Sequence, residues 1–75
     1  MDKHRCEWLD ALIGRRVKIE RKNGMYIGYL EYSGGYYHLN KPYFVDNKGH
    51  STVWSKYLFR KSSIKPKYVT ILNED

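Results

Sequence analysis

The side chains that could carry catalysis or bind a metal are few in this chain, and their spacing does not combine them. The single cysteine, Cys6, and the three histidines show no metal-ligand spacing such as C-x-x-C or H-x-x-x-H. Cys6 has no partner arranged to activate it as a nucleophile. Paired carboxylates, a phosphate-binding glycine loop and a Ser-His-Asp set are also missing. We therefore expect no enzymatic activity and no bound metal or cofactor.

The basic residues form a more informative pattern. Lysine and arginine number 14 against 8 acidic residues, which gives a net charge of +6. Five of the acidic residues lie near the two ends, so the segment from Ala11 to Asn73 holds 12 basic and 3 acidic residues, a surplus of +9. Such a segment attracts polyanions. The alternative is that these charges only keep the surface solvated.

The length of the chain, 75 residues, predicts one domain spanning residues 1–75. A core of this size rarely contributes more than about 3–5 kcal/mol, and one cysteine forms no intrachain disulfide. Self-association or unusually good packing must compensate. No run of about 18 apolar residues is present, so no membrane partner is expected. The lone cysteine and the polar first residues predict a cytoplasmic or other intracellular location.

The spacing of the apolar residues changes near Gly14, from a helical pattern to the alternating pattern of a strand. Residues 2–13 read as a helix, because four apolar residues fall on one helical face and Gly14 suits its C-terminus. Asp2 is a candidate cap for its start. Residues 15–21 alternate apolar and charged, which predicts a half-buried strand, and Asn23-Gly24 then predicts a hairpin.

The rest of the chain reads as strands joined by short turns. In the second strand, Met25–Tyr32, Gly28 marks a bend, and Ser33-Gly34-Gly35 follows as a turn. The further extended segments are Tyr36–Leu39, Tyr43–Val45 beyond a break at Pro42, Ser51–Phe59 and Tyr68–Leu72. One helix and about five strands predict an all-β small barrel with an N-terminal α-helix, the barrel covering about residues 15–72.

The ordered set of motifs resembles the Sm-like (LSm/Hfq) protein family over nearly the whole chain. The helix leads into Leu12–Ile19, Asn23-Gly24 follows, and Tyr26-x-Gly28-x-Leu30-x-Tyr32 is similar to the first family motif. Phe59–Ile64 is similar to the second motif, written I-R-G-x-x-I. The resemblance implies an Sm-like (SH3-like) fold with a five-stranded, strongly bent antiparallel sheet. Here Ser33 replaces the usual Asp, and Lys61 replaces the usual Gly.

The resemblance also implies a ring of subunits and an RNA site. In such rings the fourth strand of one subunit pairs with the fifth strand of the next, here Ser51–Phe59 and Tyr68–Leu72. We expect about five to eight copies, because a head-to-tail contact has to close. The resemblance assigns Tyr36, Tyr37 and Arg60 to single-stranded RNA, and the expected RNA site also includes Ser33, Lys61 and Ser62. The tyrosines and Arg60 would stack on bases, and Arg60 would also bind phosphate. Lys61 would add positive charge, and Ser62 and Ser63 would hydrogen-bond a base edge or phosphate.

Structural roles are the alternatives for these residues. Tyr36 and Tyr37 could fill the end of the barrel, and Arg60 could pair with an acidic residue across a subunit contact. We expect Trp54 and Tyr57 in the core or the subunit contact, and His38 and His50 as strand or surface residues. The favoured function is a homo-oligomeric Sm-like ring that binds single-stranded RNA in RNA processing or stability. The alternatives are a ring that serves as a protein-interaction scaffold and a monomeric SH3-like barrel that binds DNA or peptide.

Overall fold

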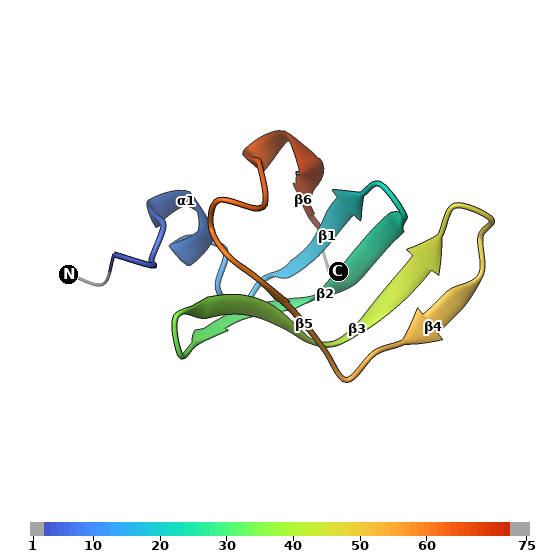
Figure 1. The fold of residues 1–75 in the computed structure, drawn as a ribbon, viewed down its shortest axis with the longest axis horizontal. Helices are drawn as coiled ribbons and strands as arrows, with labels where there is room; N and C mark the ends of the chain where they lie inside the picture. Colours follow the sequence, from blue (N-terminus) through green and yellow to red (C-terminus); the bar gives the residue numbers. More distant parts are fainter. Residues whose placement is uncertain (1–2, 73–75) are drawn as a thin grey trace.

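The computed structural model describes residues 3–72 as a small antiparallel β-fold with a short N-terminal helix (Figure 1). Its elements are α1 (Glu7–Asp10), β1 (Arg16–Arg21), β2 (Gly24–Ser33), β3 (Tyr36–Asp46), β4 (Ser51–Val53), β5 (Lys56–Phe59), the 3-10 helix η1 (Pro66–Tyr68) and β6 (Val69–Ile71). The β-rich fold predicted from the sequence is confirmed at this level. None of the helices within residues 3–72 is long and apolar enough to cross a bilayer.

The strands form one sheet in the order β4-β3-β2-β1-β6, and β5 also pairs with β3. Every pairing is antiparallel. Within residues 3–72, β6 pairs only with β1, and β4 and β5 pair only with β3. The sheet therefore has two open edges, one at β6 and one at β4 and β5. It is strongly bent, but it is not closed, so a closed barrel is not confirmed.

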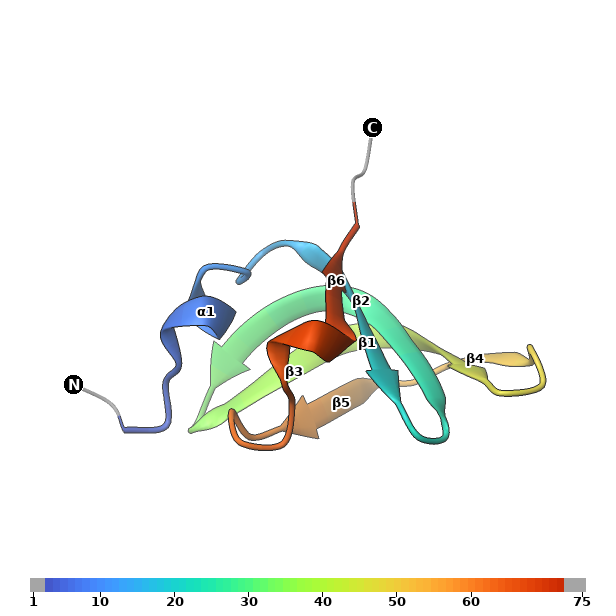
Figure 2. The same ribbon diagram turned by 90° about the horizontal axis from the view of Figure 1, so that it is seen from above.

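The bend in the sheet is centred on Gly28, as the sequence predicts. The register between β2 and β3 shifts there, so that Lys41 and Pro42 together oppose this one glycine. A Cβ atom on Gly28 would lie 3.2 Å from the Cβ of Pro42 and 3.3 Å from that of Leu39. A side chain at this position would thus be tightly packed against β3, which approaches closely here. Figure 2 shows β2 curving along its length above β3 and β5.

The strand predicted over Ser51–Phe59 is divided, which corrects that prediction. Its partner β3 bends at Lys41, whose φ of 49° is unusual for a residue other than glycine. The opposing chain bends with it at Trp54 and Ser55. The Trp54 N–H donates to the Pro42 carbonyl at 2.9 Å, and the Lys41 N–H donates to the Ser55 carbonyl at 3.1 Å. The two halves, β4 and β5, therefore lie along successive parts of β3.

The helix predicted over residues 2–13 is also shorter in the structure. The Leu12 N–H donates to the Leu9 carbonyl and the Ile13 N–H to the Asp10 carbonyl, which are the i→i+3 bonds of a tighter turn. The α-helical pattern therefore does not continue past Asp10. Gly14 has a φ of 85°, which suits the predicted end of the helical segment. The proposed cap, Asp2, lies outside the described residues.

The core lies between the concave side of the sheet and the helical segment. Its buried apolar residues are Leu9, Val17, Ile19, Tyr26, Leu30, Tyr37, Leu39, Phe59 and Ile64. An aromatic cluster continues it, because Tyr57 stacks on Tyr26 with ring centroids 3.9 Å apart. Trp54 meets the same ring edge-on at 5.1 Å and is 37% exposed. Tyr57 thus packs against the core, as the sequence predicts, whereas Trp54 is exposed at the border of the core.

Candidate nucleic-acid interface

The tip of the β2–β3 hairpin holds the candidate interface. Gly34 and Gly35 form the turn with φ values of 59° and 87°, which confirms the turn predicted there. Ser33 and Tyr36 face each other as the last pair of the ladder. The turn that follows β5 lies at the same end, because Phe59 pairs with Tyr37. We call Ser33, Tyr36, Arg60, Lys61 and Ser62 the tip site.

The side chains of Arg60 and Tyr36 are in direct contact, although the residues are 24 positions apart in the sequence. The Arg60 Cζ lies 4.7 Å from the centroid of the Tyr36 ring, and its Nη2 donates to the Tyr36 hydroxyl at 2.8 Å. The Arg60 side chain is exposed, and Tyr36 is half-buried. A cation–π contact and a hydrogen bond therefore hold the guanidinium over the ring. The structure thus brings together two of the residues that were assigned to stacking.

Lys61 binds the N-terminal segment. Its Nζ donates to the carbonyls of Lys3 at 2.5 Å and Arg5 at 3.4 Å. The contact brings the start of the chain to the tip site. Ser33 is the last residue of β2 and Ser62 lies in the middle of the turn after β5, and both residues are exposed. Both serine hydroxyls are therefore accessible to a ligand on this surface.

Tyr37 does not belong to the exposed surface, which corrects its assignment as a stacking residue. The residue is 0% exposed, and its ring packs against Tyr32 and Phe59. Its hydroxyl donates to Asp10 Oδ1 at 2.6 Å and accepts from the Cys6 N–H at 2.7 Å. Burial, followed by the bond to Asp10, raises the pKa of Tyr37 to about 12. Tyr37 therefore fills the end of the core, as the structural alternative proposed.

Two residues that sequence reasoning did not assign lie at the same end. The Arg5 Cζ lies 4.4 Å from the centroid of the Tyr32 ring, and the Arg5 guanidinium makes two 3.1 Å bonds to the Asp10 carboxylate. This bond raises the pKa of Arg5 further above its ordinary value. Arg5 precedes α1 and Asp10 is its last residue, but only the fold places Arg5 beside Tyr32. The end of the sheet therefore carries two arginine–tyrosine pairs.

The histidines take structural positions. His38 is only 4% exposed on β3, and its Nε2 lies 3.0 Å from Glu31 Oε1 on the facing strand β2. His50 lies in the β3–β4 loop, with its Nδ1 3.6 Å from Asp46 Oδ2. No group of three or more histidine, cysteine or acidic residues in the described part of the chain is arranged to hold a metal.

Comparisons with known proteins assign neither a family nor a function. No family model matches the chain, and no curated protein matches it.

Proposed function

We propose that this protein binds single-stranded RNA as an Sm-like homo-oligomeric ring, in RNA processing or stability. The observation that carries the proposal is the exposed Arg60 guanidinium held over the Tyr36 ring. Arginine planes and tyrosine rings are the groups on which unpaired bases stack, at about 1–3 kcal/mol per base. Stacking of this kind tolerates any base, so it supports strand binding rather than a particular sequence.

The charge around the pair supports the same partner. Lys61 and the backbone of Lys3 and Arg5 are joined by hydrogen bonds at this end of the sheet, so four basic residues meet there when Arg60 is included. Asp10 offsets part of this charge through its bond to Arg5. Cations beside stacking groups bind the phosphates that connect the bases. In a ring, each subunit would contribute one copy of this site to the same strand.

The topology supports assembly into a ring. The two open edges of the sheet, β6 on one side and β4 with β5 on the other, belong to the two segments that the family resemblance pairs between subunits. Apolar side chains on these edges are exposed to solvent: Val53 by 62%, Leu58 by 54% and Ile71 by 43%. An open apolar edge favours pairing with another strand. A head-to-tail pairing of the two edges closes into a ring or continues as a filament.

Fluorescence anisotropy with labelled oligo-U and oligo-A tests RNA binding. Arg60→Gln should weaken binding roughly tenfold or more, since it removes both a stacking plane and a phosphate contact. Lys48→Gln is the matched control, because it removes the same charge from the loop at the opposite end of β3. Its affinity should stay within about twofold of the wild type. The slope of affinity against salt should also decrease for Arg60→Gln.

Four results would count against this function. Absence of binding at low salt excludes the RNA role. Equal losses for Arg60→Gln and Lys48→Gln would show that only overall charge matters. Binding of a protein partner that does not respond to salt would favour the scaffold function. A single-chain mass in native mass spectrometry would exclude the ring and leave a monomeric SH3-like domain.

A further inference from the structure

A second surface feature lies beside the tip site, on the other arm of the turn that follows β5. It is a pocket of about 570 Å³ between the end of β1 and η1. Its volume falls within the range of about 300–1,000 Å³ that is typical of small-molecule sites. The residues that line it are Glu20, Arg21, Lys22, Ser63, Lys65 and Tyr68. The Ser63 N–H donates to the Arg60 carbonyl at 2.9 Å, so one turn connects the pocket to the tip site.

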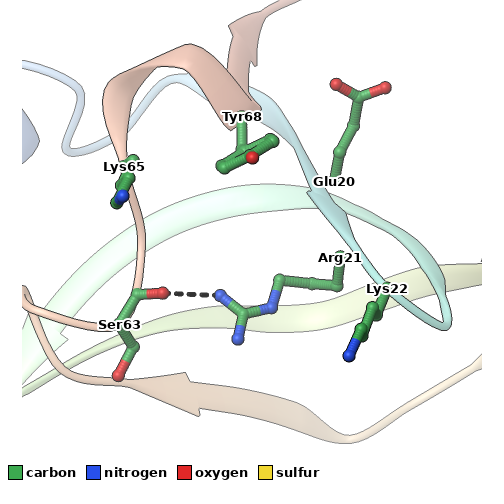
Figure 3. Close-up of a pocket in the computed structure, with 6 residues that line it drawn as sticks. All are labelled: Glu20, Arg21, Lys22, Ser63, Lys65 and Tyr68. Atoms are coloured by element: carbon green, nitrogen blue, oxygen red, sulfur yellow. Dashed lines mark hydrogen bonds between the residues drawn. The ribbon is translucent and has the colours of Figure 1, made fainter.

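Arg21 is held in a fixed position in this pocket. Its Nη1 donates to the Ser63 carbonyl at 2.7 Å. Figure 3 shows the side chain extending from β1 across the opening to reach that carbonyl. A guanidinium carries five N–H donors, and this bond uses a single one of them. Arg21 is therefore positioned in advance to donate to an anion in the pocket.

The other walls combine positive charge with an aromatic ring. Tyr68 is 43% exposed, and the Lys67 Nζ lies 5.1 Å from its ring centroid. In Figure 3, Tyr68, Lys65 and Arg21 border the same opening, while the carboxylate of Glu20 is turned away from Arg21. The lining holds three cations and one carboxylate. The pocket is therefore electropositive, with a planar side chain at its rim.

From this combination we infer that the pocket binds a nucleoside phosphate. The phosphate would accept hydrogen bonds from Arg21 and Lys65, and the base would stack on Tyr68. A simple anion would need the cations but not the exposed ring, so the ring favours a nucleotide. The nucleotide can be free or part of an RNA strand, because both present the same chemistry. The inference uses none of the residues of the tip site and goes beyond the proposed function.

Isothermal titration calorimetry with UMP, AMP, uridine and inorganic phosphate tests this site. UMP and AMP should bind saturably, and uridine should bind at least roughly tenfold more weakly because it lacks the phosphate. Lys65→Gln should weaken nucleotide binding roughly tenfold, whereas Lys48→Gln should not change it. Tyr68→Leu should weaken binding of UMP and AMP by a similar factor and leave binding of inorganic phosphate unchanged.

Lys65 carries the decisive test, since its side chain is exposed and its replacement does not disturb the bond between Arg21 and Ser63. The inference is wrong if neither nucleotide binds, if Lys65→Gln binds as well as Lys48→Gln, or if uridine binds as well as UMP. Arg60→Gln should keep nucleotide binding even where it loses RNA, which separates the two sites. A competition experiment separates the two sources of the ligand. If oligo-U without a terminal phosphate displaces UMP, the ligand is an RNA strand; if it does not, the ligand is the free nucleotide.

Discussion

Tyr36 and Tyr37 are neighbours in the sequence, but their side chains lie on opposite faces of β3. The Tyr36 ring lies at the surface under the Arg60 guanidinium, and the Tyr37 ring is buried with its hydroxyl on Asp10. Successive side chains of a strand point to opposite faces, so one of the two had to face inward. Which one does so depends on the pairing of β3 with β5, where Tyr37 faces the core residue Phe59. The periodicity of the sequence alone therefore could not predict which of the two tyrosines is buried.

The Tyr37 hydroxyl joins the N-terminal segment to the sheet, so its removal should be costly. Tyr37→Phe leaves the Cys6 N–H without its acceptor and Asp10 without one of its donors. We expect a loss of about 1–3 kcal/mol in the free energy of unfolding, measured by urea denaturation. Tyr36→Phe is the matched control at the neighbouring surface position and should cost no more than about 0.5 kcal/mol. Equal losses for the two variants would contradict the anchoring role of Tyr37.

The raised pKa of Tyr37 predicts a specific loss of stability in alkali. The folded state holds the phenol proton up to a pKa of about 12, whereas an unfolded tyrosine loses it near 10. The stabilising contribution is therefore complete below about pH 10 and is lost as the pH rises toward 12. Burial also raises the pKa of Tyr57, which acts in the same direction. Denaturation across this window should show a smaller decline for Tyr37→Phe than for the wild type; parallel declines would contradict the assignment.

At the scale of the elements, the β1–β2 hairpin depends on a close contact behind its turn. Arg21 pairs with Gly24, so Lys22 and Asn23 form the loop, one residue earlier than Asn23-Gly24 suggested. Gly24 has a φ of 146° and also pairs with Asp46 on β3. A Cβ atom there would collide with the Val45 carbonyl and lie 2.9 Å from the Asp46 Cα. Both obstacles are backbone atoms, which move only if the ladder itself shifts.

Gly24→Ala should therefore destabilise the protein by about 1–3 kcal/mol more than Gly49→Ala. Gly49 is the matched control, because its φ of 87° is also positive but nothing lies within 4 Å of an added Cβ. Gly49→Ala tests the backbone strain alone, and Gly24→Ala adds the collision. Thermal unfolding of both variants measures the difference. Similar melting temperatures for the two variants would contradict this prediction, because they would show that the β3 backbone shifts at little cost to accommodate the added Cβ.

Local patterns in the sequence predicted the elements whose causes are local. The alternation around Val17 and Ile19 identified β1, and Gly28 identified the bend in β2. The division of Ser51–Phe59 was not predictable in this way, because its cause is the bend of the partner strand at Lys41. The helix was overestimated for a related reason. Its apolar spacing suits a helix up to Ile13, but the chain turns at Gly14 to let Leu30 bond to Arg15.

At the scale of the whole molecule, part of the surplus of positive charge lies in one segment that contains no acidic residue. Arg60, Lys61, Lys65 and Lys67 follow one another between β5 and β6. The tip site uses the first two of them, and the nucleotide pocket uses Lys65 together with Arg21 from β1. A strand bound across the turn at residues 61–63 would meet both arginines. The family resemblance predicted the first site from the motif around Arg60, whereas the second depends on the approach of η1 to β1, which no motif indicates.

Ring assembly is the property that the open edges make testable. The Leu72 N–H donates to the Arg16 carbonyl, so the alternation of an antiparallel ladder directs the N–H and C=O groups of Val69 and Ile71 to the open edge. Ile71→Lys places a charge on the apolar side of that edge, which should oppose strand pairing between subunits. Thr70→Lys is the matched control, since it adds the same charge to the same strand on the side of Lys18. Native mass spectrometry should give about five to eight times the single-chain mass for the wild type and Thr70→Lys, and a monomer for Ile71→Lys. If both variants assemble like the wild type, the β6 edge is not the subunit contact.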